Sequence, residues 1–285
     1  MTLLKKLAAA LSVAVLTASA AQATTVLNDW VFNPIGQGYE SGQIVNEYLD
    51  VNGNVFYQTR RLADGRLAIR KHGVFNVVHA DSNGQLFPIN YPGGNITGIF
   101  DAYAVGKAGG AFTFTGGSVR LYQNPGQFQY ATQGGIYGAN LGNLIADLAV
   151  RPGAGGMLYQ DGIPMNDPNV TMITQGRLAE GYFFRSNGED LSTAPNVRVA
   201  LSGATSLSMP TGLLTDELAC QYAVFTGPGC NGQDFRNTPE HVFLSWNGQF
   251  KLTEVPEPGS AALFGVALLG AAAARRRALR KGQTA

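Results

Sequence analysis

The sequence has few of the residues that most often carry catalysis or bind metal ions. Only 3 histidines and 2 cysteines occur among its 285 residues. The histidines show neither the HExxH nor the HxH spacing of a zinc site, and the GxSxG motif of a serine hydrolase is missing. These absences predict a protein with no metal site, no cofactor and no catalytic residues.

Paired carboxylates are also scarce. Glu189-Asp190 and Asp216-Glu217 are adjacent in sequence, and adjacent side chains on a strand point to opposite faces. Neither pair is therefore a ready acid/base dyad. Because a glycosidase can take its two carboxylates from anywhere in the chain, a secreted carbohydrate-active enzyme or a carbohydrate-binding module stays open as the alternative function.

Apolar runs long enough for a targeting helix occur only near the two ends of the chain. Lys5 and Lys6 precede an apolar run from Leu7 to Leu16, and Ala21-Gln22-Ala23 follows. Small residues at these last positions suit a signal peptidase, with Ala21 and Ala23 marking the cleavage site. Residues 1–23 are thus predicted to be a signal peptide with a short helix.

The C-terminal end combines a proline motif, an apolar stretch and a basic cluster. In order these are Val255, Pro256, Glu257 and Pro258, then residues 259–274, then Arg275, Arg276 and Arg277. A helix of that length spans about 24 Å, somewhat less than the hydrocarbon core of about 30 Å. We expect a transmembrane helix that holds the chain briefly, with the arginines as a membrane stop on the cytoplasmic side.

These three parts, at residues 255–285, resemble the C-terminal signal of the PEP-CTERM proteins of Gram-negative bacteria. The resemblance implies recognition of Val255 to Pro258 by a membrane protease called an exosortase. It also implies export through the inner membrane, and release or transfer of the upstream domain to the cell surface or extracellular matrix.

A looser resemblance concerns the exported domain. Segments such as His72 to Asn76, Gly109 to Gly117, Gly181 to Phe184 and Phe243 to Phe250 are similar to the PEP-CTERM subgroup associated with flocculation. This implies a structural or adhesive role in aggregation or biofilm, with exopolysaccharide or a neighbouring cell surface as the partner. Tyrosines at strand ends or in loops could stack on sugar rings: Tyr91, Tyr122, Tyr130 and Tyr137.

Removing both ends makes the protein acidic. Residues 24–254 contain 13 Lys and Arg against 18 Asp and Glu, a net charge of −5, whereas the full chain has +1. Nucleic acid and anionic lipid are therefore not expected partners of this domain. Its one basic cluster (Arg60, Arg61, Arg66, Arg70 and Lys71) lies on two predicted neighbouring strands, and we interpret it as a solvated polar face.

Both cysteines, Cys220 and Cys230, lie in the exported region around Gly227-Pro228-Gly229. In an oxidising compartment a close pair of this kind is expected to form a disulfide, because metal binding would need further ligands nearby.

Turn dipeptides and alternating apolar residues predict an all-β fold for residues 24–254. Strand reversals are expected at Asn52-Gly53, Asp64-Gly65, Asn83-Gly84, Gly116-Gly117, Asp161-Gly162, Asn187-Gly188, Asn231-Gly232 and Asn247-Gly248. The resulting hairpins each have one apolar face, so a two-sheet sandwich or jelly roll is predicted as a single domain. Helix is expected mainly from Thr215 to Tyr222, with Thr215 as the N-cap.

Overall fold

The computed structural model describes residues 25–82, 85–88, 95–124, 129–164, 170–194 and 197–255. Almost all of these belong to one compact unit, Val26–Thr253. The signal peptide and the predicted helix of residues 259–274 lie outside the described residues. Within the described ranges, no helix is both long and apolar enough to cross a membrane.

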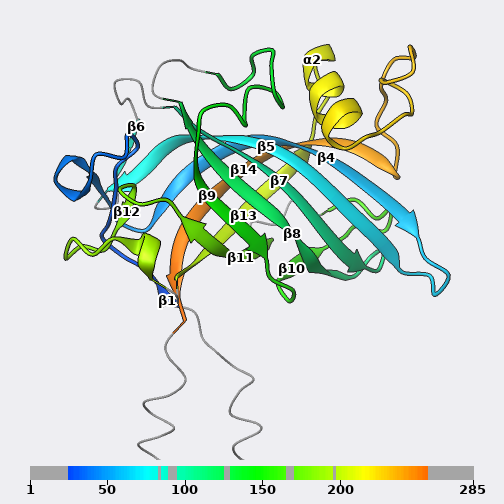
Figure 1. The fold of residues 1–285 in the computed structure, drawn as a ribbon. Coiled ribbons are helices and arrows are strands. Elements are labelled where there is room, and N and C mark those ends of the chain that lie inside the picture. The colour runs from blue at the N-terminus through cyan, green and yellow to red at the C-terminus, as the bar shows by residue number, and fades with distance from the viewer. Residues whose placement is uncertain are drawn as a thin grey trace, which may run out of the picture. The chain divides into compact units, whose positions relative to one another are not determined.

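The all-β prediction is confirmed, and the strands form two sheets (Figure 1). The large sheet contains β1 (Thr25–Val26), β4 (Tyr48–Arg61), β5 (Leu67–Ser82), β6 (Gln85–Pro88), β7 (Asn95–Gly106), β8 (Ala111–Asn124), β9 (Asn143–Val150), β10 (Gly155–Met157), β11 (Thr171–Leu178), β13 (Val197–Leu207) and β14 (His241–Glu254). The small sheet contains β2 (Trp30–Phe32), β3 (Gln43–Val45) and β12 (Phe183–Phe184). Two short 3-10 helices, Tyr39–Ser41 and Leu191–Thr193, lie in connections.

The large sheet closes on itself. β14 neighbours β13 on one side and pairs with β4 on the other, from His241 opposite Gln58 to Lys251 opposite Tyr48. β4, β5, β7, β8, β9, β11, β13 and β14 therefore form a ring, in which the edges of the long strands are paired. The two sheets thus differ greatly in size. In place of two sheets stacked face to face, one sheet bends round and covers its own apolar face.

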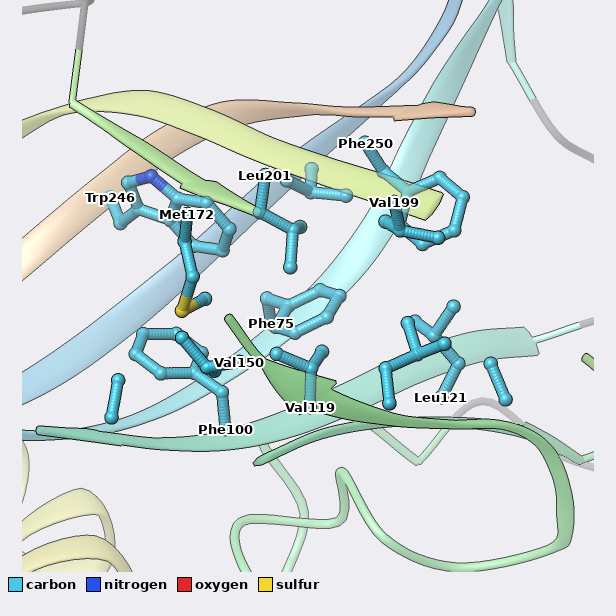
Figure 2. Packing of buried hydrophobic residues seen from close by; sticks show 14 of the residues in the cluster. Phe75, Phe100, Val119, Leu121, Val150, Met172, Val199, Leu201, Trp246 and Phe250 are labelled. Carbon is cyan, nitrogen blue, oxygen red and sulfur yellow. The ribbon is translucent and has the colours of Figure 1, made fainter. Parts of the chain in front are cut away.

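The interior of the ring is the main hydrophobic core. Alternate residues of each strand point inward, for example Val119 and Leu121 of β8, while Arg120 between them is exposed. Figure 2 shows these side chains meeting residues from opposite strands, including Val199 and Phe250. The small sheet adds Trp30, Phe32 and Phe183 to the same core, and the Phe183 ring lies 6.2 Å from Trp30 and 6.4 Å from Phe250.

Three of the predicted hairpins are wrong, because the dipeptide expected to form each turn lies inside one continuous strand. Asn52-Gly53, Gly116-Gly117 and Asn247-Gly248 belong to β4, β8 and β14. At Gly53 and Gly248, the lack of a side chain lets a neighbouring strand approach closely. A Cβ at Gly53 would lie 2.4 Å from the Val74 carbonyl oxygen, and one at Gly248 would lie 2.4 Å from that of Ser202.

Other Gly-containing dipeptides do lie in turns, as predicted. Asp64-Gly65 joins β4 to β5, and Gly65 has the positive φ of 81° that this position favours. Asp161-Gly162, Asn187-Gly188 and Asn231-Gly232 are likewise in turns or bends. Asn83-Gly84 lies outside the described residues.

The helical segment consists of α2 (Gly212–Leu214) and η3 (Thr215–Tyr222), which is a π-helix. The predicted N-cap is one turn too late: the Thr211 hydroxyl accepts from the Leu214 amide at 3.2 Å, whereas Thr215 lies inside the helix. Leu214 and Leu218 are buried and pack with Phe56 of β4 and Phe243 of β14, so the segment covers the outer face of these strands (Figure 1).

Candidate functional site

A polar groove of about 430 Å³ lies on the outer face of β4, β13 and β14. It is lined by residues from these three strands and from the segment before β9: Asn52, Gly53, Asn54, Tyr130, Ala204, Thr205, Ser206, Ser245, Trp246 and Asn247. The strands that close the ring therefore also supply most of this surface.

The groove begins where the cover provided by the helical segment ends. Along β14 the outward residues change from Phe243, which is buried, to Ser245 and then Asn247, which is exposed. β4 shows the same change in the opposite direction, from Phe56 to Asn54 and Asn52. Apolar outward positions need a cover whereas polar ones do not, so the sequence leaves this part of the face open to solvent.

Side-chain hydrogen bonds run across the floor of the groove. Asn247 Nδ2 donates to Asn52 Oδ1 at 2.8 Å, linking β14 to β4. The hydroxyls of Ser206 and Ser245 are 2.7 Å apart and link β13 to β14. These contacts hold the amides and hydroxyls in fixed positions while leaving further donors and acceptors for a ligand.

Tyr130 forms one wall of the groove. Its hydroxyl accepts from Asn54 Nδ2 at 3.1 Å and donates to the Val74 carbonyl oxygen at 3.4 Å. Burial raises the pKa of Tyr130, so the phenol stays neutral.

Tyr130 is the one described tyrosine that lines the groove, although it too packs against the cluster beneath the helical segment. Tyr137 is buried in the cluster beneath the helical segment, and Tyr122 is half-buried against the same cluster. Tyr91 lies outside the described residues.

None of the described residues that line the groove carries a charged side chain. Its three amides and the hydroxyls of Ser206 and Ser245 can each donate and accept hydrogen bonds, and the aromatic side chain of Tyr130 also lines it. Such a surface suits a neutral ligand rich in hydroxyl groups. Among the described residues, no group of three or more His, Cys, Asp or Glu could hold a metal ion.

Sequence reasoning missed Asn52 and Asn247 because each precedes a glycine and was interpreted as part of a turn. The sequence does contain a signal that each pair lies within a continuous strand. The segments around both pairs continue apolar and polar alternation through the dipeptide, as expected for one long strand.

The predicted disulfide is present: Cys220 and Cys230 are bonded, with their Cα atoms 5.4 Å apart. It ties the end of η3 to the following loop, whose Phe225 and Phe235 pack on Phe56 and Phe243. The disulfide therefore stabilises the structure that borders the groove.

The predicted basic cluster does not form one surface. Arg60, Arg61 and Arg66 are exposed, and Arg66 pairs with Asp64 at 2.7 Å. Arg70 lies 3.7 Å from Asp101 on the outer face of the sheet. Lys71, in contrast, is only 6% exposed. Adjacent residues of a strand point to opposite faces, so Lys71 points into the ring while Arg70 points outward. The prediction that Lys71 belongs to a solvated face is therefore wrong.

The predicted sorting residues lie at and beyond the last described position. Val255 directly follows β14. Pro256, Glu257, Pro258, Arg275, Arg276 and Arg277 lie outside the described residues, as do Ala21 and Ala23 at the predicted signal cleavage site.

Comparison with known proteins identifies the C-terminal segment. Residues 254–277 match the family model of the PEP-CTERM protein-sorting motif. Neither the curated proteins nor the solved structures include a match to the chain. The chain therefore carries a PEP-CTERM protein-sorting motif, which indicates a protein of a Gram-negative bacterium that is exported, processed by an exosortase and sorted to the cell surface.

Proposed function

We propose that the exported domain binds a neutral polysaccharide of the extracellular matrix and thereby acts as an adhesive or structural protein in bacterial aggregation. The observation that carries this proposal is the uncharged groove of Asn, Ser, Thr and Tyr side chains on the outer face of the ring. The sorting motif supports it, because it sends the protein to the location where such a polymer is found.

The chemistry of the groove favours a sugar over a charged polymer. Sugar hydroxyls both donate and accept hydrogen bonds, and amide and hydroxyl side chains do the same. An acidic polysaccharide would instead call for Lys or Arg, and the part of the groove that the structure describes contains neither. Tyr130 also lines the groove, and an aromatic ring is the kind of side chain on which the apolar face of a sugar packs.

We further propose that binding occurs without catalysis. Most glycosidases hydrolyse the glycosidic bond with a pair of carboxyl groups, one on each side of it. Among the described residues that line the groove there is no Asp or Glu. The chemistry therefore supports retention of the polymer rather than its cleavage.

Display of many copies at one surface compensates for weak binding at a single groove. A groove of this size contacts only a few sugar units, but a polymer offers the same units repeatedly. Each further contact along the polymer then becomes intramolecular, which raises the overall avidity.

Deletion of the gene tests the proposal in native cells. We expect loss of flocs or of matrix-bound aggregates, restored by the wild-type gene but not by an Asn52→Ala/Asn247→Ala double variant. Thr115→Ala is the matched control, since Thr115 is an exposed polar residue of β8 away from the groove. Normal flocs and matrix in the deletion strain would contradict the adhesive role.

A further inference from the structure

Lys71 places an amine inside the closed ring. It lies on β5 opposite Tyr57 of β4, and only 6% of the residue is exposed. Its Nζ lies 4.5 Å from the ring centre of Phe112, 5.3 Å from that of Phe114 and 5.7 Å from that of Tyr57. Three aromatic rings therefore surround the amine.

No carboxylate among the described residues forms an ion pair with Lys71, and Tyr57 is the one titratable side chain among the three rings. The other two lysines of the exported region differ, because Lys251 pairs with Glu47 and Lys107 is exposed. Burial lowers the pKa of Lys71 to about 7, so a large share of this amine is neutral and nucleophilic near neutral pH.

A small apolar cavity of about 40 Å³ adjoins the amine. Its walls include Phe100, Met172, Leu201 and Trp246, and Figure 2 shows Met172 near Trp246 and Phe100 inside the ring. Thr205 also lines the cavity, and its hydroxyl is buried without a hydrogen-bond partner among the described residues. The cavity thus offers one nucleophile and one unpaired hydroxyl within apolar walls.

We propose that Lys71 is a covalent binding site for a small aliphatic aldehyde, which it captures as an imine. The neutral Nζ attacks the carbonyl carbon, and the resulting carbinolamine loses its oxygen as water, together with both amine protons. The products are one C=N bond and one water molecule, and no oxidant or reductant is required. The Thr205 hydroxyl donates to the carbonyl oxygen while the nitrogen attacks.

The cavity sets the size of the aldehyde. Its volume corresponds to about three water-sized positions, which matches the three heavy atoms of acetaldehyde and excludes an aromatic aldehyde. The aromatic rings attract an ammonium, but the apolar walls replace its hydration only in part, which favours the neutral imine.

Reductive trapping tests this proposal on the mature protein. The probe is acetaldehyde with sodium cyanoborohydride at pH 7, and peptide mass spectrometry reads N-ethylation at Lys71, Lys107 and Lys251. We expect Lys71 to be modified at least about tenfold faster than Lys107, because an exposed lysine is almost fully protonated at this pH. Benzaldehyde should not modify Lys71, and the selectivity should vanish in urea.

Two variants separate the reaction from folding. Thr205→Val should slow modification of Lys71 several-fold, whereas Thr115→Ala, away from the cavity, should leave it unchanged. Lys71→Met should remove the fast-reacting site while its thermal unfolding confirms a folded protein. Modification of Lys107 with no modification of Lys71 in folded protein would overturn the proposal, and so would equal rates at both residues.

Discussion

Asn247 donates a 2.8 Å hydrogen bond to Asn52 although the two residues are 195 positions apart in the chain. They face each other across the β14–β4 pair, which closes the ring. Both amides also line the polar groove. The fold and the candidate site therefore depend on the same strand pairing, and closure of the ring assembles the groove from the two ends of the domain.

The buried carboxylate of Glu217 joins the helical segment to the loop that carries Tyr130. Only 4% of Glu217 is exposed, and its two oxygens accept from the amides of Gly134 at 2.9 Å and Tyr137 at 2.6 Å. Glu217→Gln keeps the size of the side chain but replaces one carboxylate oxygen with an NH₂ group. That group would face a backbone N–H, so two donors would meet with no acceptor between them. We expect a loss of about 2 kcal/mol in the free energy of unfolding, measured by urea titration. Asp216→Asn is the exposed neighbouring control, and an equal effect of both variants would refute this role for Glu217.

The disulfide should stabilise the domain without being required for ring closure. Cys220→Ala/Cys230→Ala opens a loop with a sequence separation of 10 residues, which packs on the outer face of β4 and β14 but contributes no strand to the ring. The chain-entropy model predicts a loss of about 2 to 3 kcal/mol in the free energy of unfolding. Far-UV circular dichroism should keep its β signal at 25 °C. A variant with unchanged stability, or one with no β signal, would show that the disulfide has another role.

Acid should destabilise the protein through His72. Its ring is fully buried and lies 5.1 Å from that of Tyr222, and burial lowers its pKa to about 4; nearby Arg70 lowers it further, while Asp101 opposes the shift. Since the folded-state pKa lies below the unfolded value of about 6.5, the unfolded chain binds the proton more tightly. The contribution of neutral His72 to the free energy of unfolding is therefore complete above about pH 6.5. It is lost as the pH falls towards 4, by up to about 3 kcal/mol.

His72→Phe keeps an aromatic ring against Tyr222 and removes the titrating group. We expect urea unfolding to show a smaller loss of stability between pH 7 and pH 4 in this variant than in the wild type. His79→Phe, on the same strand, serves as the control. If wild type and His72→Phe lose stability equally over this range, then His72 does not cause the acid sensitivity.

Local sequence patterns were sufficient to predict the parts of the structure that are determined by residues close together in the chain. The alternation in β8 correctly predicts that Phe112 and Phe114 face inward between exposed threonines. The cysteine pair was also predictable, because its loop is short and closes on itself. Asp64-Gly65 forms its turn for the same reason, since its conformation is set within four residues.

Features that depend on distant strands were not predictable in this way. Asn52-Gly53 and Asn247-Gly248 have the composition of turns, but Gly53 is needed because the backbone of Val74 lies against it. Likewise, Lys71 belongs to a run of basic residues, and only the pairing of β5 with β4 and β7 directs it into the interior. The groove itself requires β4 and β14 to meet, which is a long-range contact.

Processing of both ends can be measured by intact mass analysis of the protein from native cells. Export predicts an N-terminus at Thr24, and exosortase processing predicts loss of the segment that contains Arg275, Arg276 and Arg277. Peptide mapping identifies the new C-terminus and any attached glycan. A mature surface protein that retains residues 275–285 would show that the motif is not processed.

Affinity electrophoresis tests the binding account most directly. The mature protein would migrate through gels that contain the neutral polysaccharide purified from its own matrix, beside the Asn52→Ala/Asn247→Ala and Thr115→Ala variants. We predict strong retardation of the wild type and of Thr115→Ala, and binding about tenfold weaker for the double variant, since two amide hydrogen-bonding groups are lost. Free migration of the wild type, or equal retardation of all three proteins, would contradict binding through the groove.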